Sequence, residues 1–195
     1  MKVTAMRISG IAVSVVVTIA LTVGAVVLHG QAAFVRWDII NLNTSTTPPT
    51  ISAGGVAVSK TADNFTIRLT GSGTFVAPAG RGGGSGAATG GGTWEVLSPA
   101  NQLVASGSYV VRELVDWEFA NLQPPVLNDT IGSGGANGNA ALRIEYSDGT
   151  RGVLIVGCHG PGAPAGITEG VVATKGYLTF FAVQPGSFTV FHILR

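Results

Sequence analysis

Alternating apolar and polar residues predict antiparallel β-strands along most of the chain. Between Phe65 and Thr70, for example, Phe, Ile and Leu alternate with Thr and Arg. This period of two is typical of a strand with one face buried and the other in water. Similar patterns predict further strands at residues 34–42, 51–60, 93–97, 108–119, 142–146, 153–156, 169–175, 177–184 and 187–194.

A turn signal joins two of these runs. Asp148-Gly149 lies between 142–146 and 153–156, and an Asp-Gly pair predicts a type I′ turn with positive φ at both residues. Lys175-Gly176 and Pro185-Gly186 are further short turn signals, whereas residues 43–49, 122–139 and 158–167 predict longer loops, and no convincing soluble helix is present. We therefore expect an all-β fold, either an antiparallel β-sandwich or a closed β-barrel, preceded by one N-terminal hydrophobic helix.

The N-terminal segment has the pattern of an export signal. Lys2 and Arg7 precede the uncharged run Ile8–Leu28, which as a helix would be about 31 Å long, close to the thickness of a bilayer core. The small residues of Gly30-Gln31-Ala32 favour cleavage near Ala32, and a retained single-pass anchor is the alternative. We expect residues 1–32 to be a signal peptide or signal anchor and residues 33–195 to form a single all-β domain. That domain would be secreted or at the cell surface, touching the membrane only through residues 8–28 if these are not cleaved.

Composition supports export and excludes some partners. Only 11% of residues are charged, 46% are hydrophobic and 29 are glycine, which suits a β-rich extracellular protein. The formal net charge is +1 and Lys and Arg form no cluster. A nucleic-acid partner is therefore not expected, because phosphate contacts need concentrated positive charge.

Residues 80–92 are rich in glycine and predict a mobile loop, since such a run buries too little surface to offset its ordering entropy. A phosphate-binding loop is the alternative interpretation. The run contains no Gly-Lys-Ser/Thr and is followed by the strand-like 93–97 rather than a helix, so we favour the flexible loop.

One carboxylate interrupts an apolar strand face. Within 108–119, Glu113 lies among the apolar residues Tyr109, Val111, Val115 and Trp117 when every second position is taken. A buried Glu113 would have the raised pKa that a general acid needs. A β-bulge that returns Glu113 to solvent is the alternative, and we favour it.

Cys158 is the only cysteine, so no intramolecular disulfide forms, and it closes an apolar run that predicts burial. The adjacent His159 invites a thiol–imidazole pair. On a continuous strand, however, neighbouring side chains point to opposite faces and do not meet.

The candidate catalytic residues, if the chain is an enzyme, are His159, Glu169, His192 and Glu113. Two histidines and Glu169 are also a possible ligand set for a metal with an open position. No recognised metal-ligand spacing is present, so we assign no metal and no cofactor. Trp37, Trp94 and Trp117 are candidate sugar-stacking residues, although strand tryptophans more often belong to the core.

Several short motifs also carry a resemblance. They are Arg36-Trp37-Asp38-Ile39, Gly71-Ser72-Gly73-Thr74-Phe75, Tyr146-Ser147-Asp148-Gly149, Cys158-His159-Gly160-Pro161-Gly162 and Glu169-Gly170. Together they resemble a family of small exported β-proteins to which no activity is assigned, so the resemblance implies a fold and no site. The repeated G-x-G-T-F and G-G-G-T-W patterns are also similar to dirigent and allene-oxide-cyclase-like barrels.

Two functions remain open from the sequence. The first is an exported or surface-anchored, non-catalytic β-domain that binds a protein partner or a glycan through its loops. The second is a small extracellular hydrolase or isomerase with a His/Glu site in a barrel mouth. An apolar pocket in which a candidate carboxylate faces a histidine would favour the enzyme.

Overall fold

The fold is known from a computed structural model, in which residues 33–77 and 87–194 are described, and this part of the chain consists of strands, turns and loops. The strands are β1 (Ala33–Asn43), β2 (Thr50–Ala53), β3 (Ala57–Lys60), β4 (Thr66–Leu69), β5 (Ser72–Ala77), β6 (Ala88–Leu97), β7 (Leu103–Leu122), β8 (Asn128–Asp129), β9 (Gly135–Tyr146), β10 (Arg151–Cys158), β11 (Gly170–Lys175), β12 (Leu178–Phe180), β13 (Ala182–Val183) and β14 (Phe188–Leu194). The predicted N-terminal helix and cleavage site lie outside the described residues. Within the described ranges, no helix is long and apolar enough to cross a membrane.

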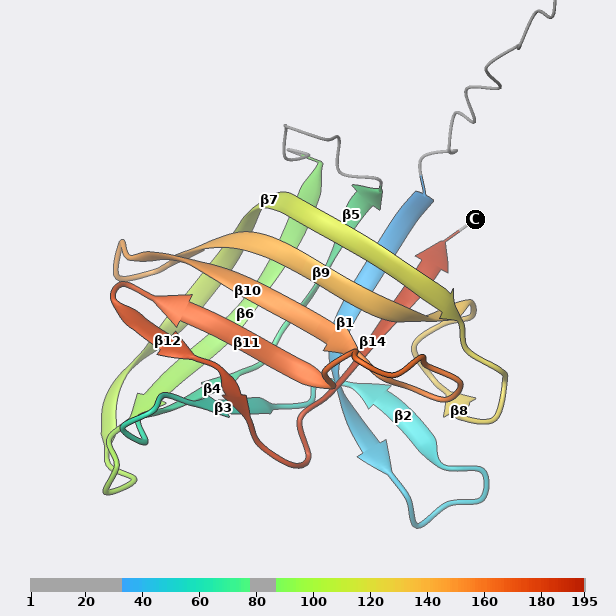
Figure 1. The fold of residues 1–195 in the computed structure, drawn as a ribbon, viewed down its shortest axis with the longest axis horizontal. Helices are drawn as coiled ribbons and strands as arrows, with labels where there is room; N and C mark the ends of the chain where they lie inside the picture. Colours follow the sequence, from blue (N-terminus) through green and yellow to red (C-terminus); the bar gives the residue numbers. More distant parts are fainter. Residues whose placement is uncertain (1–32, 78–86, 195) are drawn as a thin grey trace, which may run out of the picture.

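Six antiparallel strands close into a barrel, in the order β14, β1, β5, β6, β7 and β9. The ring closes where β9 returns to β14 through the pairs Phe191↔Ala136 and His192↔Gly135. The all-β prediction is therefore confirmed, and of the two predicted architectures the closed barrel is the one that forms (Figure 1).

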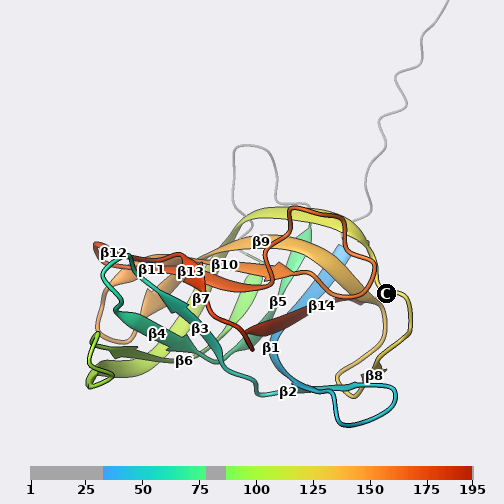
Figure 2. The same ribbon diagram turned by 60° about the horizontal axis from the view of Figure 1, so that its bottom comes forward.

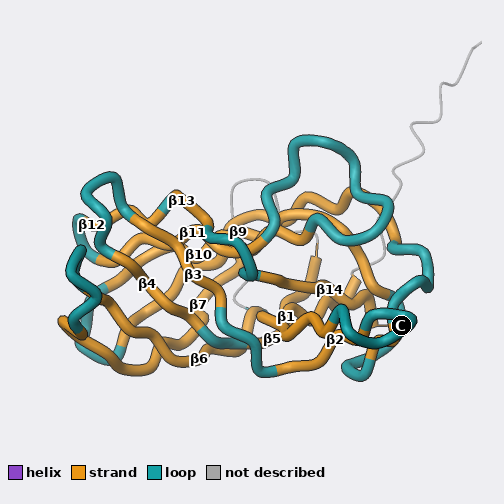
Figure 3. The backbone as a smooth tube through the Cα atoms, turned by 90° about the horizontal axis from the view of Figure 1, so that it is seen from below, coloured by secondary structure: helices purple, strands orange, loops and turns teal. Residues whose placement is uncertain are grey.

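Outer strands extend the barrel sheet on two sides. β10, β11 and β12 continue from β9, while β4, β3 and β13 continue from β6. The two extensions meet because β12 pairs with β11 and the next strand, β13, pairs with β3. A second enclosed region thus lies beside the barrel, and Figures 2 and 3 show it as the side that contains β3, β4 and β12, away from β1, β2 and β14.

Aromatic side chains fill both enclosed regions. In the barrel, Trp117 packs against Phe191 with ring centroids 4.6 Å apart and against Phe75 at 5.3 Å. In the second region, Trp94 meets Tyr146 edge to face at 5.6 Å. The barrel interior is therefore packed core, and the cavity described below lies outside it.

Two expectations about local backbone are corrected. The predicted strand 51–60 is two strands, β2 and β3, separated by residues 54–56. The Asp148-Gly149 hairpin forms, but only Gly149 has positive φ (82°), with hydrogen bonds from Gly149 N to Tyr146 O and from Tyr146 N to Thr150 O. This pattern is a type I turn followed by a left-handed glycine rather than the predicted type I′ turn.

The glycine-rich run is also only partly a loop. Residues 88–92 belong to β6 and pair with β5 on one side and β7 on the other. A Cβ at Gly90 would lie 2.3 Å from Ser72 O, and Gly90 has φ +116°, so glycine permits a close strand approach here. The rest of the predicted loop, residues 80–86, lies outside the described residues.

Candidate functional site

A cavity of about 190 Å³ lies at the end of the barrel where β1 finishes and β14 begins. Its apolar wall consists of Ile40, Leu42, Ile51, Leu127, Phe188 and Val190. Its polar lining comes from Gln123, His159, Glu169 and Thr189, with Gly160 and Pro161 beside them. The cavity therefore joins two of the predicted site residues, His159 and Glu169, to a hydrophobic surface.

The apolar wall exists because the outer face of β1 and β14 is covered. Ile40, Ile51 and Val190 form a separate buried cluster, against which Leu127 and Phe188 pack. β2 pairs with the end of β1, and β8 pairs in parallel with β2 and brings residues 122–134 over the same face. The cavity is the space that this covering leaves.

The loop of residues 159–169 forms another side of the cavity and is fixed to the barrel by Asn137 of β9. The fully buried Asn137 side chain accepts a hydrogen bond from Gly160 N at 2.9 Å and donates to Pro161 O at 3.2 Å. It also donates to Asn121 Oδ1 at 3.0 Å. One buried amide therefore holds the loop, β9 and the end of β7 together.

Glu169 closes the same loop at its far end. Its Oε1 accepts a hydrogen bond from Thr189 N at 2.7 Å, and its Oε2 accepts one from His159 N. Burial raises the pKa of Glu169, although these backbone donors oppose the shift. The carboxylate is thus both a staple between the loop and β14 and a polar group at the edge of the cavity.

His159 is exposed and has a defined tautomer. Its Nδ1 lies 2.9 Å from Ile167 O, and a carbonyl oxygen only accepts, so Nδ1 carries the proton. In the neutral ring Nε2 is then a hydrogen-bond acceptor. His159 and Glu169 share the cavity lining, but the hydrogen bond between them comes from the His159 backbone N–H rather than from the imidazole.

His192, the third candidate, does not join this pair. Its ring is fully buried and Nε2 lies 2.7 Å from Asp129 Oδ2. Asp129 Oδ1 also accepts hydrogen bonds from Ile131 N at 2.9 Å and Gly132 N at 3.2 Å. The sequence left open whether His192 meets His159 and Glu169. His192 is not part of the cavity lining, because it fastens the 122–134 segment to β14.

A neighbouring ion pair was not found from the sequence. The Arg36 guanidinium makes a bidentate contact with Asp38, at 2.7 and 2.8 Å, and the Asp38 side chain is almost fully buried. Asp38 raises the pKa of Arg36, and Asp129 adds to this effect. The signal was present, since Arg and Asp two apart on one strand share a face.

Glu113 lies away from the cavity. The pairing of β7 with β9 shifts between Val111 and Glu113, and Glu113 forms a salt bridge with Arg143 at 3.0 Å. The β-bulge interpretation is confirmed, and the extra residue sends this carboxylate to the surface. The same shift turns Leu114 inward in place of the expected Val115, and a second shift after Leu114 leaves Val115 exposed and returns Trp117 to the core side.

The three tryptophans do not form an exposed surface. Trp37 and Trp94 are 0% and 1% exposed, while Trp117 is half-buried against Phe75 and Phe191. Their rings face the packed interior because they occupy the inward positions of their strands. The interpretation of these residues as core therefore replaces the sugar-stacking platform.

Cys158 is buried and unpaired with any other cysteine, as predicted. Burial raises the pKa of its thiol to about 12, and Gln123 Nε2 lies 3.2 Å from the sulfur. A thiolate does not form readily in this setting. Cys158 faces the core while His159 is exposed, so the two side chains point apart.

Within residues 33–77 and 87–194, no three His, Cys, Asp or Glu side chains lie close enough together to hold a metal ion. Comparisons with protein-family models, curated proteins and solved structures find no match for this chain. The site therefore has to be interpreted from its own geometry.

Proposed function

We propose that this chain is an exported, non-catalytic β-domain that binds a small, largely apolar ligand in the cavity between its loops. The observation that carries the proposal is the cavity itself, with its wall of Ile40, Leu42, Ile51, Leu127, Phe188 and Val190. An apolar hollow with a few fixed polar groups is the usual form of a small-molecule site.

The size of the cavity limits the ligand. A cavity of roughly 150 Å³ lined by Leu, Ile and Phe accommodates benzene. The present cavity, at about 190 Å³, suits one ring with a small substituent. Such a ligand is smaller than a sugar chain, and the burial of Trp37 and Trp94 removes support for a glycan.

The polar edge defines the preferred substituent. Glu169 presents carboxylate oxygens, and the Nδ1 contact of His159 with Ile167 O leaves Nε2 as the ring nitrogen that faces a ligand, so both favour a ligand that donates a hydrogen bond. The negative charge of Glu169 disfavours an anionic ligand. A hydroxyl-bearing ring such as phenol should therefore bind better than benzene, and benzoate should bind worst.

The test is a titration of the full chain with phenol, benzene and benzoate, followed by NMR shifts of the cavity residues. Leu127→Trp should fill the cavity and weaken phenol binding at least tenfold. Leu103→Trp is the matched control, because Leu103 is 60% exposed on β7 and lies outside the cavity lining. Phenol shifts spread over the whole surface, or equal affinity in both variants, would exclude the proposal.

The second candidate is a small hydrolase or isomerase, and two observations favour it. Glu169 has a raised pKa, as a general acid needs, and His159 has its tautomer set by Ile167 O. Glu169 accepts hydrogen bonds from the backbone N–H groups of His159 and Thr189 and a longer one from the Thr189 hydroxyl, and these contacts belong equally to a structural staple. We therefore place this candidate second.

Hydrolysis of p-nitrophenyl acetate distinguishes the two candidates. Since His159 is exposed, His159→Gln should fold normally and lose any ester hydrolysis that depends on the imidazole. Wild-type hydrolysis that falls at least tenfold in His159→Gln would favour the enzyme. Activity no higher than that of free imidazole, or unchanged in the variant, would favour the binding domain.

A further inference from the structure

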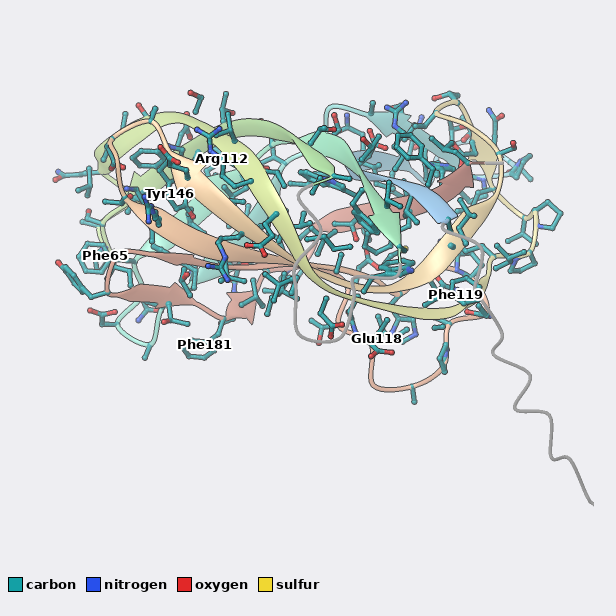
Figure 4. The ribbon with its side chains drawn as sticks, turned by 90° about the horizontal axis from the view of Figure 1, so that it is seen from above. Phe65, Arg112, Glu118, Phe119, Tyr146 and Phe181 are labelled. Atoms are coloured by element: carbon teal, nitrogen blue, oxygen red, sulfur yellow. The ribbon has the colours of Figure 1, made fainter. Side chains whose placement is uncertain are left out.

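Exposed apolar side chains gather beside the first residues of β1 and the last residues of β14. Phe34, Phe119, Leu122 and Leu194 are 44%, 48%, 47% and 38% exposed, and we call these four residues the end patch. Phe119, Leu122 and Leu194 line one hollow together with Ile193, and Phe34 pairs with Leu194 across β1 and β14. Figure 4 shows Phe119 at this side of the molecule, far from Phe65 and Phe181.

The end patch lies beside the point where the chain enters the domain. β1 begins at Ala33, next to Phe34, and the sequence before it contains the uncharged run Ile8–Leu28. Only residues 29–32 separate that run from β1, and four extended residues reach about 14 Å. Anything that holds residues 8–28 thus lies close to Phe34.

We propose that residues 8–28 are retained as a membrane anchor and that the end patch rests on the lipid surface. Phe and Leu side chains enter the boundary between headgroups and acyl chains favourably, and the four members of the patch carry no charge. The short connection also keeps the lipid at high effective concentration beside the patch. Lipid is therefore favoured over a second copy of the chain as the occupant.

This orientation places the cavity on the side away from the membrane. Ile40 lies six positions beyond Phe34 on the same strand, which corresponds to about 20 Å. Figure 1 shows β2, which contributes Ile51 to the cavity wall, at the opposite end of β1 from the tip of β14. A ligand would thus enter the cavity from the aqueous side.

The test uses the full chain in phosphatidylcholine vesicles, with an environment-sensitive fluorophore on a single introduced cysteine. Ser133→Cys places the label in the hollow of the end patch, and Ser45→Cys places it in the exposed β1–β2 loop. Cys158 is buried and should remain unlabelled. Brominated lipid should quench the label at position 133 at least twofold more than the label at position 45.

A second pair of variants tests the end patch itself. Phe119→Ser with Leu122→Ser should reduce quenching at position 133 at least twofold, while circular dichroism stays unchanged because both residues are half-exposed. Leu103→Ser with Val104→Ser is the matched control from the other end of β7, where both residues are more exposed. The control should leave the quenching unchanged.

Three outcomes would overturn the proposal. Equal quenching at positions 45 and 133 would show that the patch faces water. A blue-shifted label at position 133 without lipid quenching would identify protein as the occupant, such as a second copy. Recovery of the chain free of vesicles would show that residues 8–28 do not anchor it.

Discussion

Two regions of this molecule bring a charged side chain to a buried apolar surface, and they do so with different results. In the second enclosed region, Lys175 Nζ lies 4.2 Å from the Trp94 ring centroid and 4.7 Å from that of Tyr146, and it forms a salt bridge with Asp148. At the barrel end, Glu169 approaches the apolar wall but binds the backbone of His159 and Thr189. The lysine chain fills the space beside the aromatic rings, whereas the glutamate leaves space unfilled.

The contacts that each charged side chain makes determine whether the space beside it is filled. We call the filled region around Trp94 and Tyr146 the closed region, and the barrel end with the cavity the open region. Lys175 covers the rings with its own alkyl stem and cation, and its side chain is only 9% exposed. Both oxygens of Glu169 accept hydrogen bonds from backbone N–H groups at the ends of the loop. The side chain is therefore held at the edge of the cavity and does not fill it. The first arrangement suits stability and the second suits binding.

The largest effect is expected in the closed region, from Trp94→Ala. Removing this buried indole leaves a cavity among Tyr146 and Lys175, and such losses cost about 3–5 kcal/mol. Urea unfolding should show the change. Tyr177→Ala is the control, because Tyr177 is 96% exposed and should change stability little. A loss below about 1 kcal/mol for Trp94→Ala would mean that the two regions are equally loose.

A smaller effect is expected from Asp129→Ala at the open end. This change leaves the buried His192 without its partner and removes the acceptor for Ile131 N and Gly132 N. We expect a loss of about 1–3 kcal/mol. Hydrogen exchange should quicken in residues 122–134 and stay slow in β10 and β11.

Asp116→Ala is the matched control for that experiment, since Asp116 is an exposed aspartate on β7. It should leave exchange in residues 122–134 unchanged. Faster exchange throughout the barrel in Asp129→Ala would show that the covering segment and the barrel unfold together rather than separately.

The strands were predictable because their alternation is local, whereas the closure of the barrel was not. β9 and β14 join through two residue pairs that are more than fifty positions apart in sequence, and nothing local marks them. In β7, two β-bulges move the buried position from Val115 to Leu114, so simple alternation failed there.

The candidate site was only partly predictable for the same reason. His159 and Glu169 flank one loop, so their proximity follows from the predicted strands on either side. Asp129 lies in a segment without a repeating pattern, and its partner His192 is far away in sequence. The apolar wall depends on how residues 122–134 cover β1 and β14, which alternation does not describe.

The smallest and most specific prediction concerns pH, because the two regions should respond in opposite directions. Lys175 lowers the pKa of Asp148 to about 2 from an ordinary value of 3.8, so stability from this pair is present above pH 4 and is lost as pH falls towards 2. Burial raises the pKa of Glu169 above 4.5, so its stability is present below that pH and is lost as pH rises through the raised value.

The measurement is the urea midpoint between pH 2 and 7 for the wild type, Asp148→Asn and Glu169→Gln. The free energy of unfolding of the wild type should fall by roughly 0.5 kcal/mol or less between pH 4 and pH 2, since the Asp148 side chain is 41% exposed and solvent screens it. Asp148→Asn should not show this fall. The free energy of unfolding of Glu169→Gln should match that of the wild type within about 1 kcal/mol at pH 4, because the folded wild type favours the protonated, uncharged glutamate at that pH. The variant should lack the decline in stability that the wild type shows at higher pH. If both variants instead removed a loss of stability at low pH, the backbone hydrogen bonds to Glu169 would outweigh its burial. The folded state would then favour the ionised carboxylate of Glu169. An ionised carboxylate would then stabilise the open region, as the Asp148–Lys175 ion pair stabilises the closed one. The two regions would in that case differ only in how well their side chains are packed.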